Sequence, residues 1–263
     1  MEIRLINSKI QELIDRQETE TKLPLLLPSM HSTDCIVGEK VLDANELTVM
    51  KCPVFNEPLL YFFYGKPVYK VSAKHKIPRT DYLLSPCCFL LDSKKITAKY
   101  IYPFDTGAYK SGIYGDTIPS EMDIDSFQLK PDPTEIPEFI RTFFENNSNY
   151  LQGISTISDD QLNNAVTISL GSILRSQGVL PFDDRAKTVE IISACNVKLS
   201  EAAMAIIAPM PFLRNESFQC FTKAHPEIDV LTYFTHYPTD PYSHNEVIYQ
   251  KAIEYLTQKE GML

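Results

Sequence analysis

The sequence predicts an α+β fold, in which flanking helices pack around a mostly antiparallel sheet core. Two observations predict it. Short apolar and aromatic runs bounded by turn residues, which are typical of strands, occur before residue 134 and again after residue 178. Between these two groups the apolar residues recur with helical spacing. We therefore expect one domain over residues 1–263, with residues 134–178 as an inserted helical layer.

The first part of the chain is expected to hold one helix and several strands. Residues 2–16 have apolar residues at helical spacing, and the proline-bounded run that follows predicts a strand ending near His31. Residues 43–52 are weakly helical. The aromatic stretch "EPLLYFFYGKPVYKV" predicts a strand, a Gly-Lys-Pro turn and a second extended piece. Further strands are expected at "PCCFLLD", "ITAKYIYPFD" and "SFQLK".

The second part is expected to begin with two helices. Thr134 is a candidate N-cap for the first helix. Ser158 and Gln161 have the form of a capping box, which predicts a second helix ending at Gly178. Strands are then expected at "KTVEIIS", "AMAIIAP" and "DVLTYFTHY", followed by an amphipathic helix from Asn245 to Gln258.

Composition excludes several classes of protein. The 263 residues are 44% hydrophobic, which is enough for a substantial core, and the net charge of −9 argues against broad binding to nucleic acid or membrane surfaces. A local exception is the basic stretch "KVSAKHKIPR", so nucleic acid is not excluded as a partner. No run of about 18 apolar residues and no signal-peptide core occur. We therefore expect a soluble, cytoplasmic protein with no membrane partner.

The glycine and cysteine residues limit the kinds of nucleotide-binding and metal sites that are expected. Only 9 glycines occur, and neither a dinucleotide fingerprint nor a P-loop is present. A nucleotide would then be held mainly by side chains and aromatic stacking. The 6 cysteines form no paired ligand spacing, so no metal site is expected.

Three segments far apart in the chain carry side chains suited to a catalytic site. They are "MHSTD", "LLYFFYGKPVY" and "DDRAKTVEIIS". Taken singly, a histidine at a strand end, tyrosines in a strand and a glutamate on a strand are ordinary structural residues. Their order along the chain gives them a joint interpretation. The candidate residues are His31, Ser32, Thr33, Tyr61, Tyr64, Tyr69, Arg185 and Glu190.

In this order the segments resemble the ADP-ribosyltransferase family, in the branch with a His-Tyr-Glu signature. An early strand of that family carries H-x-T or H-x-S, as His31 to Thr33 do here. A later strand carries Tyr-Phe and then a second Tyr, similar to Tyr61 and Tyr69. A late strand carries the catalytic glutamate, in the place of Glu190, followed by a neighbouring apolar strand. The resemblance implies NAD as the substrate and an ADP-ribosyltransferase-like sheet core.

The implied chemistry gives each catalytic residue a role. Cleaving the nicotinamide–ribose bond develops positive charge on the ribose carbon, as in glycoside hydrolysis. Glu190 would hydrogen-bond a ribose hydroxyl and stabilise the oxocarbenium ion. His31 would hold the adjacent hydroxyl, and Thr33 would anchor the carboxamide, with Ser32 beside them.

Aromatic rings are expected to hold the nicotinamide. Tyr61 and Tyr69 would sandwich the ring, with Tyr64 as an alternative to either. Arg185 would contact a phosphate or brace the loop before Glu190. The stretch "YPFDTGAYKSGIYG", residues 102–115, has no assigned counterpart in the family and is interpreted as a loop near a site or a turn-rich connection.

The sequence leaves the final activity open. An ADP-ribosyltransferase and an NAD glycohydrolase are both compatible with these residues, and the acceptor is unknown. The resemblance implies a toxin or defence effector. The alternatives are a non-catalytic protein that senses a nucleotide on the same fold, and an interaction protein in which the aromatic strands are only core.

Overall fold

The computed structural model describes residues 8–16, 22–68, 82–115, 117–119, 121–176, 185–235 and 241–258. The strands are β1 (Ser29–Asp34), β2 (Glu46–Leu47), β3 (Met50–Lys51), β4 (Pro58–Tyr64), β5 (Pro86–Leu91), β6 (Tyr100–Tyr102), β7 (Glu190–Ser193), β8 (Val197–Lys198), β9 (Ala203–Pro209) and β10 (Asp229–Tyr233). The helices are α1 (Lys9–Asp15), α2 (Cys35–Ala44), α3 (Thr106–Lys110), α4 (Ile136–Phe144), α5 (Asn147–Gln152), α6 (Ala165–Arg175), α7 (Leu199–Ala202), α8 (Glu216–Ala224) and α9 (Pro241–Gln258).

An open sheet of 8 strands forms the centre, in the order β10-β9-β5-β1-β4-β7-β6, with β3 paired to β4. Among the described strands of this sheet, only β9 and β10 pair in parallel. A small separate sheet pairs β2 with β8. The expected α+β class with a mostly antiparallel sheet is therefore confirmed.

The sheet divides between β1 and β4. These strands are paired only at Ser29 with Tyr64 and at Met30 with Phe63. Beyond that point β1 continues along β5, whereas β4 continues along β7. His31 is the first residue of β1 past the division.

Most of the expected strands are present. The aromatic run forms β4, and "PCCFLLD", "KTVEIIS", "AMAIIAP" and "DVLTYFTHY" form or contain β5, β7, β9 and β10. The first strand lies later than expected, because β1 begins only after Pro28 and extends past His31 to Asp34. Proline cannot donate to a ladder, which suits a position before the strand. The piece expected after the Gly-Lys-Pro turn lies largely outside the described residues.

Two expected elements before residue 134 are wrong. Residues 43–52 are not a helix, because α2 ends at Ala44 and the left-handed Asn45 turns the chain into β2. "SFQLK" is not a strand, because the Asp123 side chain caps a 3-10 turn there, and only Leu129 forms an isolated bridge. The sequence patterns did not predict the helices α2, α5 and α8.

The two expected helices after residue 134 start at other caps. Asp132, rather than Thr134, caps the 3-10 turn that leads into α4. The capping box at Ser158 is real but opens only a 3-10 turn. Helix α6 begins later, because Asn164 forms a second capping box. The expected end at Gly178 lies outside the described residues.

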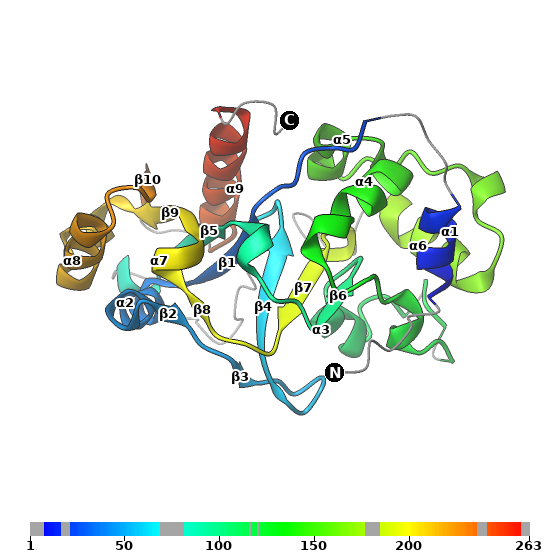
Figure 1. Cartoon of the computed structure of the whole chain (residues 1–263), viewed down its shortest axis with the longest axis horizontal. Helices are drawn as coiled ribbons and strands as arrows, with labels where there is room; N and C mark the ends of the chain where they lie inside the picture. The colour runs from blue at the N-terminus through cyan, green and yellow to red at the C-terminus, as the bar shows by residue number, and fades with distance from the viewer. Residues whose placement is uncertain are drawn as a thin grey trace.

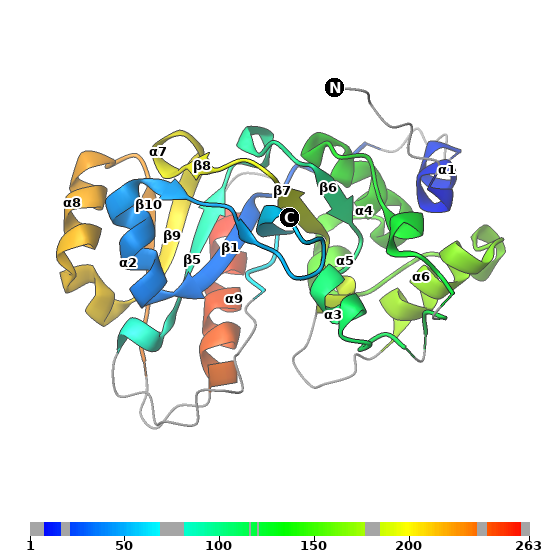
Figure 2. The same cartoon turned by 90° about the horizontal axis from the view of Figure 1, so that it is seen from below.

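The helical layer, which comprises α4, α5 and α6, is inserted in the sequence between β6 and β7, and these two strands are neighbours in the sheet. Figures 1 and 2 show α4, α5, α6 and α1 gathered beyond β6, whereas α2, α8 and α9 accompany the β10 end of the sheet. Tyr150 of α5 ties the layer to the sheet. Its hydroxyl donates to the Tyr64 carbonyl at 2.7 Å and accepts the Val189 amide at 3.1 Å.

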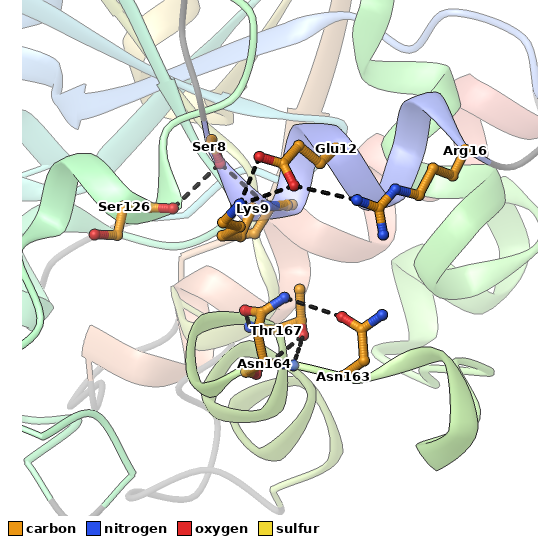
Figure 3. Close-up of polar contacts among 9 residues, drawn as sticks. Ser8, Lys9, Glu12, Arg16, Ser126, Asn163, Asn164 and Thr167 are labelled. Carbon is orange, nitrogen blue, oxygen red and sulfur yellow. Dashed lines mark hydrogen bonds and ion pairs between the residues drawn. The ribbon is translucent and has the colours of Figure 1, made fainter.

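Helix α1 is fixed to this layer by polar contacts (Figure 3). The Ser8 hydroxyl accepts from the Ile10 amide and donates to the Ser126 carbonyl at 3.1 Å. Glu12 lies between Lys9 and Arg16 on the outer side of the helix. The capping box of α6, formed by Asn164 and Thr167, lies nearby in the same view. Within the described ranges, no helix has the length and apolar character needed to cross a membrane.

We predict that Tyr150→Phe lowers the free energy of unfolding by about 1–3 kcal/mol, because it leaves a buried carbonyl and a buried amide unpaired. Urea denaturation measures this change. Tyr82→Phe is the matched control, since the half-buried Tyr82 ring packs on Phe212 and a loss within about 0.5 kcal/mol is expected. Equal midpoints for Tyr150→Phe and the wild type would contradict the prediction.

Candidate functional site

Glu190, at the start of β7, is buried in the middle of one branch of the divided sheet. It pairs with Phe63 of β4 on one side and with Tyr102 of β6 on the other. Its side chain is only 2% exposed. The carboxylate oxygen Oε2 accepts two hydrogen bonds from Thr106, from the amide at 3.0 Å and from the hydroxyl at 2.7 Å. Glu190 is therefore not a solvent-facing strand residue.

The environment of Glu190 changes its protonation. Burial, together with the negative charge of Asp105, raises the pKa of Glu190 to about 8, while the two Thr106 hydrogen bonds act in the opposite direction. At neutral pH the group is therefore largely protonated, and a cation placed beside it would favour the ionised form. Perturbed carboxyl groups of this kind are typical of functional sites.

The loop that holds Glu190 starts helix α3. Asp105 is the N-cap, and its Oδ1 accepts the Ala108 amide at 3.0 Å. The Asp105 amide donates to the Arg185 carbonyl at 3.1 Å, and the Arg185 guanidinium lies 3.9 Å from the Asp105 carboxylate. Of the two roles predicted for Arg185, bracing the loop is the one that these contacts describe.

Tyr61 lies on the same face of the sheet as Glu190. It is two residues from Phe63 on β4, and alternate residues of a strand point to one face. The half-buried phenol donates to the Cys52 sulfur, which also accepts the Val54 amide at 3.2 Å. Burial, the Cys52 contact and the charge of Glu190 raise the pKa of Tyr61. The phenol therefore stays neutral.

Tyr64 points to the opposite face. It is three residues from Tyr61 along β4, and it is completely buried. Its hydroxyl accepts the Leu27 amide at 2.8 Å, and its ring lies against Tyr150. These contacts place Tyr64 in the core beneath the helical layer, away from Glu190.

His31 lies at the division of the sheet and contacts β4. Its Nδ1 is 2.8 Å from the Tyr61 carbonyl, and its ring meets Phe62 edge-on. A carbonyl only accepts, so Nδ1 carries the proton. Burial lowers the pKa of His31, so the ring is neutral at neutral pH and Nε2 is an acceptor. By register His31 belongs to the face opposite Glu190, but the absence of β1 pairing here lets its ring lie beside the β4 backbone.

The other predicted residues are placed as follows. Thr33 shares the face of His31 and pairs with Cys87. Ser32 points to the other face and lies beside the Cys88 thiol of β5. Tyr69 lies outside the described residues.

The sequence patterns did not identify Thr106, Asp105 or Cys52 as residues of the candidate site. The signal for the first two was present, because an Asp-Thr pair after a strand is a typical helix start inside the unassigned segment 102–115. No sequence signal indicated that Cys52 would accept the Tyr61 hydroxyl. Their roles depend on contacts between distant strands.

Aromatic rings continue along the same face toward β6. Phe55 stacks on Tyr100 with ring centroids 5.3 Å apart, and on Tyr102 at 6.1 Å. Glu57 accepts from the Tyr100 hydroxyl at 3.2 Å and pairs with Lys99. Rings of this kind can stack against a planar ligand. In the described part of the chain, no three His, Cys, Asp or Glu side chains are grouped as metal ligands.

Comparisons with models of protein families, with curated proteins and with solved structures find no match for this chain.

We predict that Glu190→Gln stabilises the protein progressively as the pH rises from about 4.5 to about 8. The carboxyl pKa is raised on folding, so its contribution is fully present below the unfolded pKa and is lost as the pH rises through the folded one. A glutamine side chain does not titrate and has no such loss, so the difference reaches about 4 kcal/mol. Chemical denaturation at several pH values measures it.

Glu216→Gln is the control, because Glu216 is exposed on α8. Its stability curve is expected to follow that of the wild type. Parallel curves for Glu190→Gln and the wild type would show that Glu190 is not perturbed.

Proposed function

We propose that this protein is an NAD-consuming enzyme, an ADP-ribosyltransferase or an NAD glycohydrolase. The observation that carries the proposal is the adjacency of three segments that are distant in sequence, in which Tyr61 and Glu190 share one face of the sheet and His31 belongs by register to the other. The histidine, tyrosine and glutamate segments occupy β1, β4 and β7, which are adjacent in the sheet. This arrangement supports the resemblance to the His-Tyr-Glu branch of the ADP-ribosyltransferase family.

The contacts of the three residues suit their proposed roles. The neutral His31 ring keeps an Nε2 acceptor for a ribose hydroxyl. The half-buried Tyr61 ring is held by its hydroxyl contact with Cys52, and the proposal assigns this ring to stacking on nicotinamide. Glu190 offers a carboxyl group of which one oxygen is already fixed by Thr106.

The proposed reaction breaks the bond between the ribose carbon and the nicotinamide nitrogen. The bonding electron pair leaves with the nitrogen, so neutral nicotinamide departs and the ribose becomes an oxocarbenium ion. Ionised Glu190 stabilises this cation and accepts a hydrogen bond from the ribose hydroxyl. The acceptor then attacks the ribose carbon and loses a proton. Water as acceptor gives a glycohydrolase, and a macromolecule gives a transferase.

We predict that Glu190→Gln reduces nicotinamide release from NAD by at least about 100-fold, because the charge that stabilises the transition state is lost. Chromatography of released nicotinamide measures the rate. Glu216→Gln is the matched control, and its rate is expected to equal that of the wild type. Undiminished release by Glu190→Gln would remove its proposed role.

The pH dependence gives a second test. We predict that kcat/KM for nicotinamide release rises with pH and levels off above about 8, because only ionised Glu190 stabilises the cation. Below that value the rate should fall about tenfold for each pH unit. A rate that is flat between pH values of about 6 and 9 would contradict this role of the carboxylate.

The acceptor is identified with NAD labelled in its ADP-ribose part. Purified protein is incubated with this NAD and cell lysate, and the label is followed into protein, nucleic acid and free ADP-ribose. The proposal expects label in at least one of these fractions. Binding of NAD without release, and no effect of Glu190→Gln, would favour a nucleotide sensor on the same fold.

A further inference from the structure

The segment 102–115, which has no counterpart in the family resemblance, contacts Glu190 through its first turn. We propose that Thr106 and Asp105 are positioning residues, which fix the orientation of the Glu190 carboxyl group and set the charge of its oxygen Oε1. The inference rests on the proposed function, because that function gives Oε1 its partner, the ribose hydroxyl.

The orientation follows from two donors on one oxygen. The amide and the hydroxyl of Thr106 both bond Oε2, and Oε1 has no hydrogen-bond partner among the described residues. An exposed glutamate rotates freely about its last bond, but this pair of donors allows one setting. The proton of the acid form is then carried by Oε1, because Oε2 already accepts two hydrogen bonds.

The two donors are themselves held in place. Thr106 is the first residue of α3, and the Asp105 side chain caps that helix. The backbone of Asp105 is bonded to Arg185, which precedes β7. The loop is thus bonded both to Glu190 and to the turn that precedes β7, which restrains the position of Thr106 relative to Glu190.

The protonation of the Glu190 carboxyl group depends on the groups that face it. Asp105 places a negative charge beside it, partly offset by Arg185 at 3.9 Å from the Asp105 carboxylate. From β4 and β6 the facing groups are the phenols of Tyr61 and Tyr102, and burial raises the pKa of both, so they stay neutral. The Tyr102 hydroxyl donates to Asp125. Asp105 therefore favours the acid form of Glu190, and Thr106 favours the carboxylate.

The opposite effects of Asp105 and Thr106 on the protonation of Glu190 have a chemical consequence. A protonated Oε1 is a donor and cannot stabilise a cation, whereas an ionised Oε1 can. The nicotinamide ring of NAD carries a positive charge, and its arrival beside Glu190 would favour ionisation. In the absence of NAD, the negative charge of Asp105 favours the neutral acid form of Glu190.

The test compares Thr106→Val, Thr106→Ser and Asp105→Asn with the wild type. Valine keeps the shape of threonine but removes the hydroxyl donor, serine retains it, and asparagine keeps an oxygen that can cap α3. The titration of the Glu190 carboxyl group is followed without NAD by carbon-13 NMR, with Glu190→Gln used to assign the signal. Circular dichroism confirms that each variant is folded.

The expected shifts have opposite signs. Thr106→Val raises the titration midpoint by about one pH unit, Thr106→Ser leaves it unchanged, and Asp105→Asn lowers it by about one pH unit. At neutral pH, Thr106→Val then releases nicotinamide about tenfold more slowly than the wild type, and the difference disappears above about pH 10. A merely structural role would lower the rate equally at every pH.

The outcomes separate the two proposals. A midpoint that does not move in Thr106→Val or in Asp105→Asn overturns the positioning role, whatever the activity. If Thr106→Val does not fold, the sign of the Asp105→Asn shift decides the matter alone. A wild type that releases no nicotinamide overturns the proposed function, even where the titrations move as expected.

Discussion

The separation of β1 from β4 is the constraint on which the rest of the site depends. Two residue pairs hold these strands together, and then each strand follows a different neighbour. The backbone of β4 past this point has lost its partner on one side, and His31 supplies a side-chain donor to the Tyr61 carbonyl in its place. An unpaired buried carbonyl is costly, so the contact both satisfies this backbone group and fixes the histidine tautomer.

Burial of a carboxylate in the other branch works against stability. Glu190 and Asp105 are both almost fully buried, and they are close enough for the charge of Asp105 to raise the pKa of Glu190. Thr106, Arg185 and the cap of α3 offset part of this cost. A site that keeps a destabilised carboxyl group in this way is typical of function, since a plain core would bury an apolar residue there.

Sequence patterns predicted most of the strands, including those that carry the His31, Tyr61 and Glu190 segments. The prediction succeeded where the signal is local, as in the alternating aromatic run of β4 and the apolar run of β9. It was wrong where two local signals compete. The capping box at Ser158 is present, yet the stronger helix begins at Asn164, and "SFQLK" follows the Asp123 cap into a turn. Caps act over three residues, and the sequence does not rank them.

The sequence by itself determined the fold class, the order of the His31, Tyr61 and Glu190 segments and the absence of a glycine-rich phosphate loop. Only the tertiary structure decided which residues meet. The structure shows that the face of β4 that carries Tyr64 is covered by Tyr150 of the helical layer. It also shows that Thr106, 84 residues before Glu190 in the chain, contacts the Glu190 carboxyl group. Such contacts depend on strand register and on chain return, which are long-range properties that local spacing does not encode.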